Sequence, residues 1–417
     1  MKFSATVSTA PDQIAVAPGY LQEEWLDSGR RYFRYEMDAP ILNFWSILSA
    51  DYTVKRDEWR PASGGEPVAI EIFYHDAHEY NVDKMIQAIK ESLDYFTVEF
   101  SPYQHRQVRI LEFPQYASFA QAFPNTIPYS ESIGFIADAS AEEDIDFVFY
   151  VTAHEVAHQW WAHQVIGANV QGATLMSESL SQYSSLMVME RHYGPQKMPK
   201  FLQYELNGYL RGRGGETIEE LPLLLNEGQQ YIRYQKASLV FFALKEYIGE
   251  AALNEALRDY IAEVAFQEPP YTISTELYEH LKRATPERFQ YLLADMFEKI
   301  TLYDNRTISA TVRERDDGKF ELTLELQARK LYADGKGNET EAEQLDDWIE
   351  VGAYVEREVE GEKVEEPIYL ELHRFDGSES TVTLVLDERP LEAGIDPRNL
   401  LIDRAPRDNR RKVEDAG

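Results

Sequence analysis

The spacing of hydrophobic residues along the chain changes twice, which divides it into three regions. Residues 1 to about 60 combine short apolar runs with turns, as strands do. From Asp144 to about Lys299, apolar positions three and four residues apart predict helices. Beyond Tyr303, apolar and polar residues alternate, which predicts strands again. The pattern therefore predicts an α+β chain in which a mainly helical region lies between two β regions.

A linker rich in proline and glycine, Pro61 to Gly65, separates the first two regions. We expect an N-terminal β domain at residues 1–62 and a mainly helical domain at 63–303. The second domain should open with a strand at Val68 to Tyr74 and a helix whose N-cap is Asn81. Further helices are predicted at residues 183–193 and 237–247.

The C-terminal region is predicted to be a β-sandwich at residues 304–405. Alternation is clearest around residues 320–326, 349–355 and 382–386. Asp317-Gly318 and Asp376-Gly377 are turn dipeptides typical of hairpins. The polar residues 406–417 follow as a frayed tail.

Composition excludes several classes of protein. The net charge of −32, from 73 acidic and 41 basic residues, argues against a nucleic-acid partner, because phosphate binding depends on lysine and arginine. The absence of cysteine excludes disulfides and thiolate metal ligands. No run approaches the roughly 18 consecutive apolar residues that span a bilayer, and the N-terminus has no secretory signal pattern. We therefore expect a soluble chain without a membrane span.

The strongest chemical signal is the motif HExxH at residues 154–158. On a helix, His154 and His158 lie four residues apart on one face and can share a metal ion, while Glu155 points to the side. Glu155 is then placed to take a proton from a water molecule on the metal. The alternative is a pair of histidines buried in an ordinary core helix. We expect one Zn²⁺ per chain.

A catalytic zinc needs a third protein ligand. His163 is five residues past His158, on a different side of a continuing helix, and is interpreted as an ordinary polar residue. The metzincin pattern is absent, because Trp161 and Gln164 replace its glycine and last histidine. Glu178 is the better candidate, since it begins a predicted helix that can return beside the first. The alternative is a glutamate that stabilises a helix N-terminus.

The sequence from His154 to Trp161, followed by Glu178, resembles the gluzincin aminopeptidases. The resemblance implies a thermolysin-like zinc peptidase domain, here at 63–303. The family's usual spacing would place its glutamate at Ser177, so that Glu178 implies one inserted residue in the connecting loop.

The same resemblance implies two further site residues. Tyr234, in a segment similar to the family's Tyr-x-Lys-Gly, would stabilise the oxyanion, with Tyr231 as its rival. Glu131 would bind the ammonium group of the substrate, although the glycine, methionine and asparagine of the family's motif are missing around it.

The sequence therefore predicts a zinc-dependent metallopeptidase, with an aminopeptidase acting on peptides as the first hypothesis. The chain most resembles peptidase modules fused to bacterial ABC-transporter-like permeases, which implies tethering to a membrane permease. A peptide-binding or coupling module with little hydrolysis, and an endopeptidase, remain as alternatives. Two other polar segments, 75–79 and 142–146, are interpreted as a solvated turn without further partners and an acidic surface loop.

Overall fold

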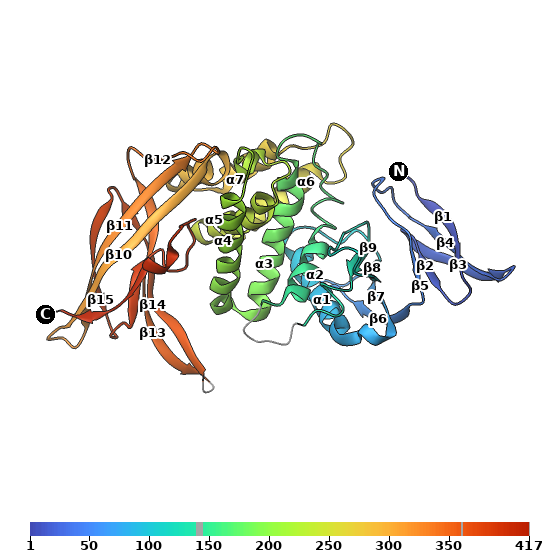
Figure 1. The fold of residues 1–417 in the computed structure, drawn as a ribbon, viewed down its shortest axis with the longest axis horizontal. Helices are drawn as coiled ribbons and strands as arrows, with labels where there is room; N and C mark the ends of the chain where they lie inside the picture. Colours follow the sequence, from blue (N-terminus) through green and yellow to red (C-terminus); the bar gives the residue numbers. More distant parts are fainter. Residues whose placement is uncertain (139–144, 360–361, 417) are drawn as a thin grey trace. The chain divides into compact units, whose positions relative to one another are not determined.

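The structure, a computed structural model, describes residues 1–138, 145–359 and 362–416 (Figure 1). It divides into two compact units, each discontinuous in sequence. The first contains Met1–Gly194 and Asn254–Leu281, and the second contains Pro195–Leu253 and Lys282–Gly417. The mixture of helices and sheets is the predicted α+β class. Because the helical region contributes to both units, the boundaries after residues 62 and 303 stay predictions.

The first unit begins with two small antiparallel sheets, as the apolar runs near the N-terminus predict. A three-stranded sheet has the order β1-β4-β3, and β2 pairs with β5. Phe33 and Tyr35, two residues apart on one face of β4, are buried in the core beneath it. The strands are β1 (Ser4–Thr9), β2 (Ile14–Val16), β3 (Tyr20–Asp27), β4 (Arg30–Glu36) and β5 (Leu48–Ala50).

A four-stranded sheet, in the order β6-β7-β8-β9, forms the centre of the first unit. Strand β6 is antiparallel to β7, whereas β7, β8 and β9 are parallel, so that their carboxyl ends meet at one edge. The residues from Ala120 to Phe123 pair antiparallel with β9 and lie beyond it. The strands are β6 (Thr53–Trp59), β7 (Val68–Tyr74), β8 (Gln107–Phe113) and β9 (Thr126–Ser130).

Helices pack beside this sheet (Figure 1). Helix α1 buries its predicted apolar face, and α2 and α3 pack against each other. Asn81 occupies the N-cap of α1, but its side chain donates hydrogen bonds to the carbonyls of Gly134 and Ala137 and not to the helix. The helices are η1 (Asp76–Asn81), α1 (Val82–Glu99), α2 (Phe147–Ala157), η2 (Leu175–Ser179) and α3 (Leu180–Tyr193).

The chain returns to the first unit at Asn254, after its excursion into the second. The amide of Asn254 donates to the Tyr95 hydroxyl and to Glu99 on α1, and its oxygen accepts from the Tyr183 hydroxyl on α3. The returning segment lies in α6 (Glu250–Val264) and α7 (Ser274–Ala284). None of the helices in the described part of the chain combines the length and apolar composition that crossing a bilayer requires.

The second unit combines helices with the strands of the C-terminal region. Helix α3 ends at Tyr193, as predicted, and the next long helix ends at Gly214. The helices of the second unit are η3 (Pro195–Lys197), α4 (Met198–Gly214), η4 (Leu223–Leu225), η5 (Ile232–Lys236), α5 (Ala237–Ile248), η6 (Glu287–Phe289), α8 (Gln290–Leu293), η7 (Ala294–Glu298) and η8 (Pro406–Asp408).

The strands of the second unit form two sheets. One has the order β12-β11-β10-β18 with β15 on β11, and the other has the order β14-β13-β16-β17. The alternating runs predicted as strands lie in β11, β13 and β15. The strands are β10 (Ile300–Glu314), β11 (Phe320–Ala333), β12 (Glu339–Glu341), β13 (Asp347–Val359), β14 (Glu362–Phe375), β15 (Glu379–Leu386), β16 (Glu392–Ile395), β17 (Arg410–Lys412) and β18 (Glu414–Asp415).

Two predictions for this region are wrong. Asp317-Gly318 joins the paired strands β10 and β11, but Asp376-Gly377 joins β14 to a strand of the other sheet and is no hairpin turn. Residues 406–417, predicted as a frayed tail, contain β17 paired with β16 and β18 paired with β10. The tail is held because Asn409 is buried and Arg410 forms ion pairs with Glu365 and Glu392.

Candidate metal centre

Helix α2, which carries the HExxH motif, is fixed at its N-terminus by Asp146. The Asp146 carboxylate accepts the backbone N–H of Phe149 at 3.0 Å and so caps the helix. It also binds Lys84 Nζ at 2.6 Å and the Tyr193 hydroxyl at 2.8 Å. One side chain thus connects α1, α2 and α3. The preceding acidic residues 142–144 lie outside the described part of the chain, so the predicted surface loop stays a prediction.

His154, His158 and Glu178 meet at one point in the first unit. Glu178 Oε2 lies 3.3 Å from His154 Nε2 and 3.3 Å from His158 Nε2. Ligand atoms at 2.0–2.1 Å from a tetrahedral Zn²⁺ would be separated by roughly 3.3 Å. The donor set and its spacing therefore fit zinc.

The orientation of His158 is set by groups on its other nitrogen. Nδ1–H donates to the carbonyl of Trp161 at 3.0 Å, and Ser181 Oγ lies 3.0 Å from the same nitrogen. These contacts leave Nε2 for a metal. Burial alone would lower the pKa of His158, but the charge and hydrogen bond of Glu178 raise it to about 9.

Glu178 lies in η2, a π-helical turn that leads into α3. Burial alone would raise the pKa of Glu178, but His158 and His154 hold it well below its usual range, so that it is a carboxylate. A π-helical turn contains more residues than an α-helical one and often occurs at functional sites. The extra residue between His158 and Glu178 can thus be accommodated in the helix, whereas the sequence predicted an insertion in the loop.

Glu155 lies beside this set but has different partners. A carboxylate oxygen of Glu155 lies within 4.8 Å of ligand atoms of both histidines, so that distance alone would also allow it to bind the metal. Its carboxylate accepts a hydrogen bond from the backbone N–H of Ala122, and burial raises its pKa. Among the described residues, none hydrogen-bonds its buried Oε2. Glu178 thus contacts both imidazoles, whereas the hydrogen-bond partner of Glu155 is the backbone of Ala122.

The segment from Ala120 to Phe123 was missed in the sequence. Ala122 donates its N–H to Glu155 and accepts a hydrogen bond from His163 Nε2 at 3.0 Å. The available signal was the Pro124-Asn125 dipeptide, a turn before β9 in which Asn125 has φ of 53°. His163 is thus buried and holds this strand, with its pKa lowered to about 4 mainly by burial. The sequence analysis placed His163 on another side of a continuing helix, but α2 ends at Ala157, so His163 does not lie on that helix.

Tyr234 lies in the second unit, on the π-helical turn η5. Its rival Tyr231 packs against Gly212, where an added Cβ would lie 2.4 Å from the Tyr231 Cβ. The Tyr231 hydroxyl accepts a hydrogen bond from Gln229 at 3.2 Å and also bonds Glu216. These contacts hold Tyr231 within the second unit.

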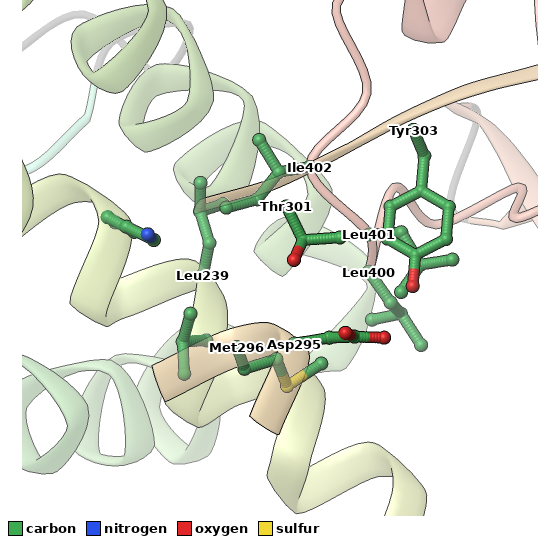
Figure 2. Close-up of a pocket in the computed structure, with 10 residues that line it drawn as sticks. Leu239, Asp295, Met296, Thr301, Tyr303, Leu400, Leu401 and Ile402 are labelled. Atoms are coloured by element: carbon green, nitrogen blue, oxygen red, sulfur yellow. The ribbon is translucent and has the colours of Figure 1, made fainter. Parts of the chain in front are cut away.

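Lys236, the lysine of the Tyr-x-Lys segment, lines a small cavity with Asp295, Thr301 and Tyr303 (Figure 2). Its Nζ donates to the carbonyl of Lys299 at 3.4 Å, and burial lowers its pKa to about 8. The cavity is lined mainly by aliphatic residues such as Leu239, Leu400 and Ile402. It belongs to the core of the second unit.

Glu131 directly follows β9 and has its own set of neighbours. Its Oε1 accepts the backbone N–H of Gln115 at 3.0 Å, and its Oε2 lies 3.8 Å from His78 Nδ1. His78 also contacts Glu112. The segment 75–79, interpreted as a turn without further partners, therefore does have partners, because strand ends distant in sequence meet it.

Comparison with known proteins identifies relatives of this chain and of its fold. A family model described as the peptidase family M1 domain matches residues 80–297, more than half of the chain. Probable aminopeptidase 1 of Sulfurisphaera tokodaii is 23% identical over 223 residues, which cover 51% of this chain and 28% of that protein. The chain spans less than half the length of the curated relatives it matches.

Two solved structures share the fold. Aminopeptidase A of Legionella pneumophila, in complex with aspartic acid, has a TM-score of 0.62 at 14% identity, over 100% of this chain and 45% of that one. The M1 zinc metallopeptidase of Deinococcus radiodurans has a TM-score of 0.53 at 16% identity, over 71% of this chain and 63% of that one.

Proposed function

Because this chain belongs to peptidase family M1, we propose that it is a zinc-dependent metallopeptidase, and specifically an aminopeptidase that removes N-terminal residues from peptides. The observation that carries the proposal is the meeting of His154, His158 and Glu178 around one point, with the buried Oε2 of Glu155 beside them. We propose that these three residues hold one Zn²⁺. A protein that only bound peptides would have no use for Glu155.

The chemistry then divides among a few groups. Zn²⁺, when bound, polarises the scissile carbonyl and lowers the pKa of water, so that a nucleophile forms near neutral pH. Glu155 accepts a proton from the attacking water and delivers it to the leaving amine. Burial raises its pKa and so favours uptake of the proton from water. Tyr234 is proposed to donate a hydrogen bond to the developing oxyanion.

The strand beyond β9 offers a place for the peptide backbone. Phe119, Gln121 and Phe123 direct their backbone groups towards β9, so those of Ala120 and Ala122 face the other way. Ala122 uses its groups on Glu155 and His163, next to the ligand set. A peptide that pairs with this edge near Ala120 would have its backbone aligned beside Glu155.

Glu131 is proposed to bind the substrate's ammonium group. Replacing it with glutamine should raise KM for peptides with a free N-terminus while leaving cleavage of blocked peptides unchanged. Endopeptidase action is the second candidate, favoured because the contacts of Glu131 are to Gln115 and His78. Equal cleavage of free and acetylated peptides would favour it.

The central test is Glu155→Gln, which keeps the shape of the side chain and removes the base. We expect peptide hydrolysis to fall by at least about 100-fold while zinc remains bound, measured by peptide cleavage and metal analysis on the same sample. Glu79→Gln, an exposed glutamate on η1, is the matched control. Retained hydrolysis in the Glu155 variant would reject the mechanism.

Attachment to a membrane permease is proposed on the sequence resemblance. In that setting the chain could act as a peptide-binding or coupling module with weak hydrolysis. Binding of both free and acetylated peptides without cleavage of either would favour the module over the peptidase.

A further inference from the structure

Three potential metal ligands meet at an edge of the central sheet, outside the HExxH site. Glu112 lies near the end of β8, Glu131 directly follows β9, and His78 lies on η1, shortly after β7. Since these three strands are parallel, their carboxyl ends lie side by side. In sheets of this kind, ligand sites form beyond the carboxyl ends of the strands.

Each carboxylate accepts a backbone N–H with one oxygen and points its other oxygen towards His78 Nδ1. Glu112 Oε2 accepts the backbone N–H of His75 at 2.6 Å, and Glu131 Oε1 accepts that of Gln115 at 3.0 Å. The remaining oxygens lie 2.5 Å and 3.8 Å from His78 Nδ1. One ligand atom of each residue falls within 4.8 Å of the others. Hydrogen bonds of this type orient the metal-ligating side chains before a metal binds.

The segments that carry these residues are also tied to one another. The Asn81 amide, at the end of η1, donates to the carbonyls of Gly134 and Ala137 in the loop that follows Glu131. The N–H of Ile136 binds the carbonyl of Glu131 itself. The positions of His78 and Glu131 are therefore fixed relative to each other.

The charge balance of the cluster calls for a cation. The side chain of Glu112 is only 5% exposed and that of Glu131 is 18% exposed. In the described part of the chain, neither carboxylate forms an ion pair with a lysine or arginine, and His78 is their shared partner. Two carboxylates that face a single imidazole leave a net negative charge in a poorly solvated place, and a divalent cation would offset this charge.

We propose that His78, Glu112 and Glu131 form a second metal site, which binds a divalent transition-metal ion such as Zn²⁺. One imidazole and two carboxylates are ligands that zinc accepts, with a fourth position left for water. A metal would take the place of the hydrogen between His78 Nδ1 and Glu112 Oε1, widen their separation from 2.5 Å to the roughly 3.3 Å of two zinc ligands, and bring Glu131 Oε2 closer.

As a metal ligand, Glu131 has a role other than the ammonium binding proposed above. A metal ion on Glu131 and a substrate ammonium on Glu131 compete for the same oxygen. The site must therefore be tested by metal binding, in a protein whose HExxH ligands are gone.

The experiment uses the His154→Ala/His158→Ala double variant of the full chain. Zinc titration against a competing chromophoric chelator, with metal analysis after dialysis, should find one zinc equivalent still bound. Adding Glu112→Gln or His78→Gln should weaken that binding at least about tenfold. The control is Glu79→Gln, which changes the residue directly after His78. It should leave the zinc affinity of the second site unchanged.

Circular dichroism and the thermal midpoint establish that each variant is folded. The side chain of His78 is 25% exposed and that of Glu112 only 5%, so His78→Gln tests the site with less risk of misfolding. No zinc on the double variant, or unchanged zinc after both substitutions, would overturn the second site. If instead the HExxH residues hold no zinc, so that the proposed function fails, the double variant will bind as much zinc as the unmodified chain. The two failures therefore give different results.

Discussion

At the scale of single residues, the contacts of His158 determine which of its nitrogens faces the ligand set. The Trp161 carbonyl and Ser181 Oγ both lie 3.0 Å from Nδ1 and so orient Nε2 towards Glu178. Ser181→Ala removes one of these two contacts. We expect zinc affinity to fall by about tenfold, at the lower end for such outer groups because the carbonyl remains.

Zinc titration with a competing chelator measures this effect. Ser185→Ala is the matched control, since Ser185 is buried on the same helix but bonds the carbonyl of Gln182. Equal zinc affinity of the two variants would show that Trp161 alone orients His158.

At the scale of elements, the position of α2 depends on its N-cap. Asp146 caps the helix and joins it to Lys84 and Tyr193. Asp146→Ala should lower the free energy of unfolding of the first unit by about 2 kcal/mol, because a cap alone contributes about 1 kcal/mol and the ion pair and hydrogen bond are lost with it. Urea denaturation followed by tryptophan fluorescence measures the change.

Asparagine at the same position separates these contributions. It is an equally good N-cap but carries no charge for Lys84, so Asp146→Asn should cost less than the alanine variant. A loss as large as that of alanine would assign the whole effect to the charge.

At the scale of the whole molecule, a buried histidine makes stability depend on pH. Burial, with the charges of His163 and Arg109, lowers the pKa of His105 to about 3. The unfolded chain takes up a proton on this histidine below about pH 6.5 and the folded chain does not, so stability is lost as the pH falls from 6.5 towards 3. His105→Phe removes this dependence. At pH 5 the variant should lose about 2 kcal/mol less than the unmodified chain, relative to pH 7.

The unmodified chain must be compared with the His105→Phe variant, because other groups change the stability in the opposite direction as the pH falls. Burial raises the pKa of Asp403 to about 6, so its protonation favours the folded state as the pH falls below that value. Asp403 is present in both proteins and cancels in the difference. Parallel stability curves from pH 7 to 5 would contradict the role of His105.

Local patterns in the sequence predicted the elements well but not their partners. Periodicity located α3, α5 and the strands around Phe320 and Ile349 because burial of one face leaves its mark on neighbouring residues. Asp376-Gly377 has the chemistry of a turn, yet nothing local specifies that the next strand joins the other sheet.

The candidate site shows the same difference. His154 and His158 could be proposed together because helix spacing relates them, and Glu178 because it begins a predicted helix that can return beside theirs; the three residues do meet. The roles of these residues, and those of Tyr234 and Glu131, stay predictions. Ala122 could not be found by side-chain chemistry, since it contributes its backbone. His78 and Glu112 are 34 residues apart and meet only through the order of the parallel strands.

The interruption of the first unit by residues 195–253 has a consequence for synthesis of the protein. A nascent chain that has reached Gly194 already carries the HExxH helix and Glu178, but not Asn254, which joins Tyr95 and Tyr183. Asn254–Leu281 must leave the ribosome before this unit can close. By then the first helices of the second unit have also emerged, so the two units cannot mature strictly one after the other. Translational pauses before Asn254 would hold the metal-binding helices in an unfinished and protease-sensitive state.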